Sequence, residues 1–215
     1  MRFIAFEKVI PEINKLSLPG LETQLKMAPL FRKKLLERFK EARKSAKLAA
    51  VLALFYPSSS ADTNLVLILR KVYKGVHSAQ VGFPGGKPEI EDASLLDTAL
   101  RETWEEIGVS SKKITVLREL SAIYIPPSNF QVHPFIGISN RPINFKLQAS
   151  EVDGVIEVSL SDFLNDDYEV ISEILDANGS THSVPAFKLN GQIVWGATAM
   201  VLIEIKTMLN QVLKK

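Results

Sequence analysis

Three glutamates in the segment Ser94–Ile107 have the spacing at which side chains meet on one face of a helix. Glu102, Glu105 and Glu106 stand at positions i, i+3 and i+4, where like charges repel one another unless cations neutralise them. Oxygen ligands gathered in this way suit hard divalent ions, and magnesium is the usual one in phosphate chemistry. A solvated acidic patch gives the same pattern, so the glutamates alone do not distinguish a metal site from an ordinary surface.

The loop before this helix contains a second feature, the adjacent glycines Gly85 and Gly86. Glycine allows the backbone to adopt positive φ and to approach a ligand closely. A loop of this kind that leads into an acidic helix can present a backbone carbonyl to a metal ion. We therefore count Gly86 with the glutamates as a candidate ligand. Arg101 lies one turn before Glu105 and is placed to brace its carboxylate. Together, the loop and the helix favour a metal site.

These residues resemble the Nudix box, whose usual form is G-x5-E-x7-R-E-U-x-E-E-x-G-U, with U a bulky aliphatic residue. The positions that match are Gly86, Arg101, Glu102, Glu105, Glu106, Gly108 and Val109. Asp92 stands where the first glutamate is usual, and the spacer from it to Arg101 is one residue longer. Thr103 fills a position that is usually aliphatic. The Arg-Glu-x-x-Glu-Glu-x-Gly core of the box is intact.

Sequence on both sides of the box is similar to the coenzyme A pyrophosphatase branch of this family. The similar segments are Leu67–Arg70, His77–Gly86, Pro127–Pro134 and Ile193–Ala199. Lys74-Gly75 stand where the branch commonly has Leu-Arg, and Ala79 replaces a glycine. The substrate-binding residues that the resemblance implies are Arg70, Lys74, His77, Gln80, Ser128 and Phe130. Structural roles without substrate contact stay open for three of them. Arg70 could end a strand, His77 could be a solvated loop residue, and Phe130 could anchor the core or a loop.

The resemblance implies hydrolysis of coenzyme A or its thioesters to 3′,5′-ADP and a 4′-phosphopantetheine product, with Mg²⁺ or Mn²⁺ as the cofactor. Divalent ions held by Glu102 and Glu106 would screen the charge of the diphosphate and lower the pKa of a bound water. Glu105 is the candidate third ligand or the acceptor of the proton from water, and with Arg101 it forms the predicted catalytic pair. Glu151 is either a further metal ligand or a surface glutamate.

Two other functions share these features. A Nudix hydrolase that acts on ADP-ribose or a dinucleotide would have the same metal ligands, so only the segments outside the box favour coenzyme A. A non-catalytic nucleotide-binding Nudix module would be expected to have lost a metal carboxylate, whereas this chain keeps all three glutamates.

Hydrophobic periodicity predicts the elements that position these residues. We expect helices as far as about Ser17, with an interruption at Pro11, and over Leu30–Lys47, Ser94–Ile107 and Ala197–Leu213. Strands are predicted at Leu48–Tyr56, Asn64–Arg70, Ile114–Glu119, Ser121–Tyr124, Val132–Ser139, Gly154–Val158, Val184–Leu189 and Gln192–Val194. The fold class is α/β: a Nudix-type α/β/α sandwich with a mixed β-sheet and an extra N-terminal helical region. Residues 1–47 form the helical extension, packed on a Nudix hydrolase domain of residues 48–215.

Composition limits the partners of the chain. Its 215 residues carry a net charge of +2, which gives no reason to expect nucleic acid as a partner. No apolar run reaches the roughly 20 residues that cross a bilayer, and cysteine is absent. We expect a cytoplasmic enzyme with a small-molecule substrate and no membrane partner; a homodimer is compatible with the sequence. The basic segment Leu30–Lys47 could hold an anionic substrate or dock on a membrane, but a solvated helix face is the favoured interpretation.

Overall fold

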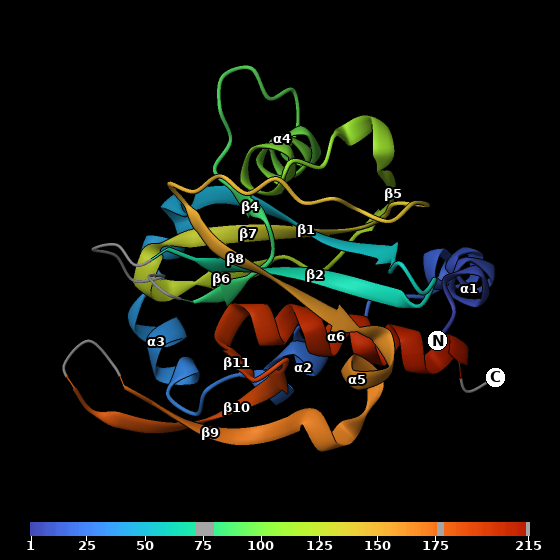
Figure 1. The fold of residues 1–215 in the computed structure, drawn as a ribbon. Coiled ribbons are helices and arrows are strands. Elements are labelled where there is room, and N and C mark those ends of the chain that lie inside the picture. Colours follow the sequence, from blue (N-terminus) through green and yellow to red (C-terminus); the bar gives the residue numbers. More distant parts are fainter. Residues whose placement is uncertain (72–79, 176–178, 214–215) are drawn as a thin grey trace.

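A mixed β-sheet forms the centre of the molecule (Figure 1). The computed structural model describes residues 1–71, 80–175 and 179–213, and within them this sheet has eight strands. The strands are β1 (Lys47–Pro57), β2 (Thr63–Arg70), β3 (Val81–Gly82), β4 (Gly85–Gly86), β5 (Thr115–Glu119), β6 (Ile123–Ile125), β7 (Phe130–Ile138) and β8 (Val152–Ser159). The main path runs β3-β2-β1-β7-β5. The predicted mixed sheet is confirmed, because β1 pairs in parallel with β7 and antiparallel with β2.

Strand β1 lies at the centre of this sheet and is buried on both faces. Leu52 and Leu54 belong to the hydrophobic cluster beneath helix α4 (Leu95–Ile107). Ala53 and Phe55, which alternate with them, belong to the larger cluster on the opposite face. A strand covered on both faces reads as a continuous apolar run, which explains the sequence of this segment.

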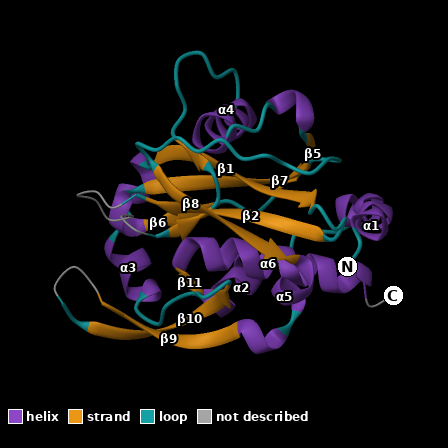
Figure 2. Cartoon of the chain, in the orientation of Figure 1, coloured by secondary structure: helices purple, strands orange, loops and turns teal. Residues whose placement is uncertain are grey.

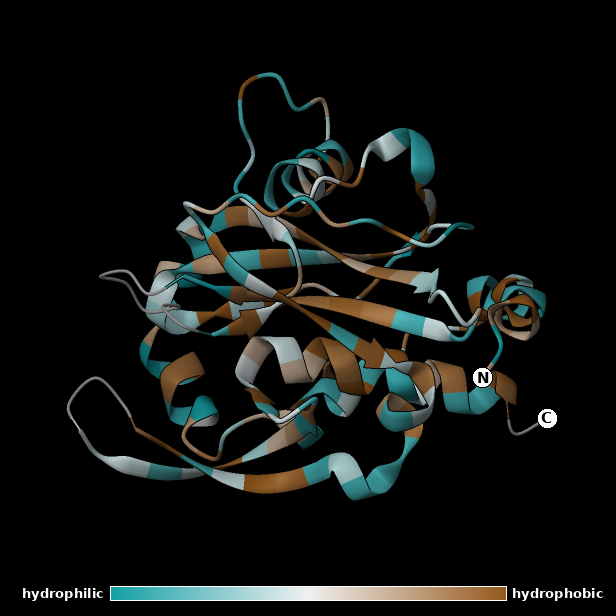
Figure 3. Ribbon diagram, in the orientation of Figure 1, coloured by the Kyte–Doolittle hydropathy of each residue, from teal (hydrophilic) through white to brown (hydrophobic). Residues whose placement is uncertain are grey.

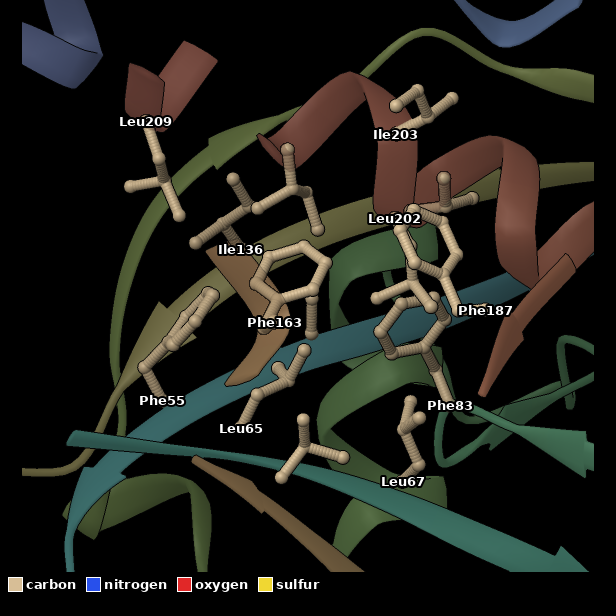
Figure 4. Close-up of a cluster of buried hydrophobic side chains, with 14 of the residues drawn as sticks. Phe55, Leu65, Leu67, Phe83, Ile136, Phe163, Phe187, Leu202, Ile203 and Leu209 are labelled. Atoms are coloured by element: carbon tan, nitrogen blue, oxygen red, sulfur yellow. The ribbon is translucent and has the colours of Figure 1, made fainter. Parts of the chain in front are cut away.

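Helices cover both faces of the sheet (Figures 1 and 2). Helix α4 covers one face, and α2 (Gly20–Gln24) and α6 (Gly196–Leu213) lie on the other. Helix α1 (Phe3–Lys15) lies at one end of the sheet and contributes to the same hydrophobic cluster as α6. Apolar residues dominate α6 and the central strands (Figure 3). Figure 4 shows Leu202 of α6 beside Phe83 and Phe187, within the same buried cluster as Phe55 and Leu65 of the sheet. The α/β/α arrangement is therefore confirmed.

A second, three-stranded sheet packs against the outer side of α6, in the order β11-β10-β9. Its strands are β9 (Glu169–Leu175), β10 (Thr181–Leu189) and β11 (Gln192–Trp195). Helix α5 (Leu160–Leu164) leads into it from β8. The strands predicted at Val184–Leu189 and Gln192–Val194 are confirmed and pair as the hairpin of β10 and β11, whereas β9 was not predicted. Its apolar residues Ile171 and Leu175 are exposed, so no buried face marks it in the sequence.

The N-terminal helices share the core of the sheet. The ring of Phe6 in α1 lies 5.0 Å from that of Phe55 between centroids. In α2, the side chain of Gln24 donates a hydrogen bond to the buried Glu204 of α6 at 2.8 Å. The boundary predicted at residue 47 coincides with the start of β1, although hydrophobic contacts cross it throughout. None of the helices in the described ranges has the length and apolar character needed to span a membrane.

Two predictions about the N-terminal region are wrong. Helix α1 continues through Pro11 instead of being interrupted there. The basic segment Leu30–Lys47 is not one helix: α3 covers Arg32–Arg38, and a 3₁₀ turn follows at residues 42–45. Its last part is held against β7, because the Lys47 N–H donates to the Asn129 carbonyl at 2.9 Å. This pairing draws the end of the segment into the sheet.

Candidate active site

Helix α4 begins and ends where the sequence predicts. The Asp97 N–H donates to Ser94 Oγ at 3.2 Å, which caps the first turn, and Gly108 ends the helix with φ 74°. The core face of the helix carries three buried residues, Ala99, Thr103 and Ile107. This packing turns the neighbouring face, which carries the glutamates, toward the loop before the helix.

The three glutamates differ in exposure although they are neighbours on the helix. The side chain of Glu105 is 44% exposed, that of Glu102 15% and that of Glu106 2%. A solvated acidic patch therefore does not explain this face, because two of its carboxylates are turned into the protein. Burying a carboxylate is unfavourable unless hydrogen bonds or cations compensate its charge.

Glu106 is held between the glycine loop and an arginine. The Gly85 N–H donates to Glu106 Oε2 at 2.8 Å, and Arg70 Nη1 lies 3.5 Å from Glu106 Oε1. Burial raises the pKa of Glu106 to about 7 against the effects of Arg70 and the Gly85 N–H, and the negative charges of Glu102 and Glu151 raise it further. Arg70 and the Gly85 N–H therefore compensate the cost of burying this charged carboxylate only in part.

Glu102 lies directly against Gly86. A Cβ atom at position 86 would collide with the Glu102 carboxylate, so only glycine fits there without moving it. Burial raises the pKa of Glu102, and the charge of Arg101 acts against that rise. A side chain at position 85 would meet the backbone of β1 at Ala50, and Gly85 has φ +149°. Both glycines are therefore needed to bring the loop this close to the carboxylates.

Arg101 organises the exposed side of the same face. Its guanidinium donates to Glu105 Oε2 at 3.0 Å, to Glu102 Oε1 at 3.2 Å and to the Lys87 carbonyl at 2.9 Å. The predicted bracing of Glu105 is confirmed. The same group also ties the helix to the loop that follows Gly86.

Asp92, which stands where the Nudix box usually has a glutamate, anchors Arg101. Its two carboxylate oxygens accept hydrogen bonds from Arg101 Nε and Nη2, both at 3.0 Å. The Glu89 N–H and the Thr98 hydroxyl donate to Asp92 Oδ2 at 2.9 Å each. The hydrogen bonds from Arg101 lower the pKa of Asp92 to about 2. A shorter carboxylate therefore serves as an acceptor for the arginine in this chain.

Arg70 occupies a positioning role in addition to lining the site. Arg70 Nη2 donates to the Gly85 carbonyl at 2.7 Å, and the same guanidinium pairs with Glu106. It lies at the end of β2, so the simple interpretation as a strand end is correct for its backbone. Its side chain nevertheless fixes the glycine loop beside the carboxylates.

The carboxylates fit a divalent cation by their chemistry. No three His, Cys, Asp or Glu side chains in the described ranges are grouped as a ready-made metal site. Arg101 and Arg70 pair with the glutamates instead. Glu106 is nevertheless buried and Glu102 half-buried, and burial raises the pKa of both. The negative charge of Glu151 raises both pKa values further. Glu151 is exposed, yet its negative charge acts on these two carboxylates. A hard divalent ion would relieve the excess of negative charge.

A cavity of about 490 Å³ adjoins the glycine loop on the face of the sheet that carries α6. Its walls come mainly from apolar side chains of the α3 region, β1, β6, β7 and the first turn of α6. The polar and charged side chains that line it are Arg32, Arg70, Gln80, Lys87, Ser128 and Thr198. The cavity therefore joins a mostly apolar space to the loop that contacts Glu102 and Glu106.

The structure brings four of the predicted substrate-binding residues together in this cavity: Arg70, Gln80, Ser128 and Phe130. Lys74 and His77 lie outside the described residues. The ring of Phe130 has Lys87 Nζ 5.5 Å from its centroid, so it is a wall residue with a cationic neighbour. Substrate contact by these side chains stays a prediction.

Several lining residues were missed by the sequence analysis. Phe31, Lys87 and Trp195 line the cavity and were not named as site residues. Arg32, which belongs to the basic segment considered for an anionic substrate, lines it as well. Arg32 is 8% exposed, so the solvated helix face predicted for the basic segment is wrong at this position. The sequence signals at Arg32 were its place in the basic segment and its position directly after Phe31 and one turn before Leu35 and Leu36.

Comparison with known proteins bears directly on this arrangement. A family model described as the NUDIX domain matches residues 46–176. The chain belongs to the Nudix family. The matched residues contain the glycine loop, α4 and the central sheet, while α3, β10, β11 and α6 lie outside them.

Nudix relatives support the assignment at the level of sequence. The uncharacterized Nudix hydrolase NudL of Yersinia enterocolitica serotype O:8 is 32% identical over 149 residues, which cover 69% of this chain and 75% of the relative. NudL of Yersinia pestis strain Pestoides F is 32% identical over 142 residues, covering 66% and 70%. The enzyme class, a hydrolase of phosphorus-containing anhydrides, follows from this family.

A solved Nudix structure supports the fold. The Nudix hydrolase RenU of M. smegmatis superposes with a TM-score of 0.54 over 78% of this chain and 88% of the other, with 14% sequence identity. At this identity the likeness concerns the Nudix fold alone.

Proposed function

We propose that this Nudix hydrolase cleaves the diphosphate bond of coenzyme A, and of its thioesters, with Mg²⁺ or Mn²⁺ as the cofactor. The observation that carries the proposal is the cavity beside the glycine loop. Arg70, Gln80, Ser128 and Phe130 line it, and these residues come from the segments that resemble the coenzyme A branch.

The character of the cavity supports coenzyme A over ADP-ribose. The terminal ribose of ADP-ribose carries several hydroxyl groups, each of which needs a hydrogen-bond partner when it leaves water. The walls at Phe31, Ile123, Val132 and Val201 offer none from their side chains. An apolar wall suits the alkyl parts of a pantetheine arm or an acyl chain better.

Glu102, Glu106 and the Gly86 carbonyl would hold the cation, which supplies charge screening and Lewis acidity to the diphosphate. Arg70 keeps the Gly85 carbonyl and Glu106 in place and faces the cavity, where it can contact the phosphates. Glu105 is the most exposed of the three glutamates and is oriented by Arg101, so it is proposed to accept the proton of the attacking water.

The reaction adds the elements of water across the bridging phosphorus–oxygen bond. The oxygen of the water becomes part of one phosphate product, and the protons are taken up by the base and the departing phosphate. The products are 3′,5′-ADP and 4′-phosphopantetheine. A purely nucleotide-binding role is disfavoured, because the glutamates, Arg101 and its anchor Asp92 are all present and connected.

Product analysis by mass spectrometry tests this function. The protein is incubated with coenzyme A, ADP-ribose, NADH and a dinucleoside polyphosphate, each with Mg²⁺ and with excess EDTA. We expect kcat/KM for coenzyme A to exceed that for ADP-ribose by at least about tenfold, or roughly 1.4 kcal/mol of differential transition-state binding. If ADP-ribose is the better substrate, the coenzyme A assignment is wrong and the reaction class stands. A cytoplasmic location and a homodimer remain predictions.

A further inference from the structure

Arg32, the first residue of α3, is a buried cation with an unsatisfied donor. It is 8% exposed, and its Nη2 donates to the Tyr124 carbonyl at 2.7 Å. Its Nε is buried and has no hydrogen-bond partner among the residues that the structure describes, and no carboxylate there pairs with the guanidinium. Removing a charge from water without a counter-ion is unfavourable, so this arrangement is not explained by stability.

Ser128 repeats this pattern in the same cavity. Its hydroxyl oxygen is buried and likewise has no hydrogen-bond partner within the described ranges. Both residues line the cavity that leads to the glycine loop. Unsatisfied buried polar groups are rare in folded proteins, and two that share one cavity point to a ligand that completes them.

The charges around the cavity specify an anionic ligand. The described residues that line it include Arg32, Arg70 and Lys87, but no Asp or Glu. Arg70 is already occupied by the Gly85 carbonyl and Glu106. Burial lowers the pKa of Arg32, and a guanidinium that stays charged there gains most from a doubly charged acceptor such as a phosphate monoester.

The position of Arg32 separates this anion from the diphosphate that is cleaved. Helix α3 lies on the same face of the sheet as α6, whereas α4 with its carboxylates lies on the opposite face (Figure 1). The glycine loop reaches both, because it contacts Glu102 and Glu106 and also lines the cavity. A ligand whose diphosphate lies at the glycine loop would therefore extend toward Arg32 with another part of its structure.

We propose that Arg32 and Ser128 bind a phosphate monoester of the substrate that is remote from the cleaved bond, the 3′-phosphate of a 3′-phosphorylated nucleoside diphosphate. The proposal rests on the proposed function, since coenzyme A is a substrate of this class. It places substrate selection in a residue outside the matched Nudix domain of residues 46–176. Binding energy from such a remote group can lower the barrier as well as hold the substrate.

The test compares coenzyme A with dephospho-coenzyme A in wild type, Arg32→Gln and Lys34→Gln. Lys34 is an exposed cation in the same helix and does not line the cavity, so its substitution is the matched control for charge. We expect wild type and Lys34→Gln to prefer coenzyme A by about tenfold or more in kcat/KM. In Arg32→Gln the preference should fall below about threefold, with the loss mainly on coenzyme A. An undiminished preference in a folded Arg32→Gln variant overturns the proposal.

Calorimetry of 3′,5′-ADP and 5′-AMP without metal gives a second readout that needs no turnover. We expect 3′,5′-ADP to bind more tightly to wild type, and Arg32→Gln to remove that difference. If the protein does not hydrolyse coenzyme A but shows this pattern, the proposed function fails and the anion site stands. If it hydrolyses coenzyme A and the two nucleotides bind equally, the anion site fails alone. Should Arg32→Gln not fold, Ser128→Ala and Arg32→Lys decide: unchanged selectivity for 3′,5′-ADP in both overturns the proposal.

Discussion

The carboxylate face of α4 and the cavity on the other side of the sheet are built in opposite ways. On α4, nearly every polar group has a partner: Arg101 alone bonds to Asp92, Glu102, Glu105 and the Lys87 carbonyl. In the cavity, the walls are apolar, and the buried polar atoms Arg32 Nε and Ser128 Oγ have no partner within the described residues. Paired groups hold one geometry without a ligand, whereas unpaired groups gain their partners only when a ligand binds.

The two regions also differ in how they are assembled along the chain. The polar frame of α4 comes from one continuous stretch of residues 85–106, together with Arg70. The cavity draws its walls from segments spread between residues 29 and 201, several of them outside the matched Nudix domain. We infer that the chemistry of the site is general to diphosphates, while substrate choice depends on the distant segments. The following substitutions test that division.

Glu106→Gln should have the largest effect on turnover. It removes the buried carboxylate beside the glycine loop, and we expect kcat to fall by on the order of 10³-fold, about 4 kcal/mol. Stability without metal should change little, because a neutral amide avoids the desolvation of a buried charge. Mg²⁺ should raise the melting temperature of wild type more than that of the variant. Steady-state kinetics measure the fall in kcat, and thermal unfolding with and without Mg²⁺ measures the changes in stability. Full turnover in the variant would contradict the assignment of Glu106 as a metal ligand.

Gly86→Ala should reduce kcat by roughly 10²-fold, because its Cβ displaces the Glu102 carboxylate and small displacements of this kind are costly to catalysis. Gly154→Ala is the control, since a Cβ at that position meets nothing within 4 Å. The two variants are compared by kcat and by melting temperature. Equal activity in both would show that the contact between loop and helix does not position Glu102.

Asp92→Asn should lower kcat by about tenfold, because Arg101 loses its charged anchor while its other partners remain. It should also flatten the dependence of stability on acid pH. Hydrogen bonds from Arg101 hold the folded pKa of Asp92 at about 2, below its unfolded value of about 4, so this carboxylate stabilises the fold above pH 4. That contribution is lost as the pH falls from about 4 to about 2. Urea unfolding across this range, with the exposed Asp153→Asn as control, measures the difference.

Phe31→Ala should have the smallest effect, a rise in KM for coenzyme A of about threefold with kcat nearly unchanged, because it removes wall surface remote from the cleaved bond. Leu30→Ala is the matched control: Leu30 is 92% exposed and does not line the cavity. A large fall in kcat for Phe31→Ala would mean that the cavity wall and the carboxylate face are coupled, and the proposed division between chemistry and selection would then fail.

The carboxylate face was predictable because its determinants are local. The i, i+3 and i+4 spacing places Glu102, Glu105 and Glu106 together whatever the rest of the fold does. Likewise, Ser94 and Gly108 mark the ends of α4 through contacts within a few residues. The mixed order of helices and strands also predicted the layers of the sheet. These features depend on neighbours in the sequence, so the sequence by itself determined them.

Only the tertiary structure decided what each group does in its surroundings. Helical periodicity did not distinguish Glu106 from Glu105. In the structure, the glycine loop and Arg70 bury Glu106, whereas Glu105 is exposed to solvent. Asp92 read as a departure from a motif until its bonds to Arg101 were visible. Arg32 was one cation in a basic run, but α3 packs against the turn at Pro126–Ser128 and Arg32 bonds to the Tyr124 carbonyl, so it is buried in the cavity. Burial and pairing depend on residues far apart in the chain, and no local pattern records which of them will meet.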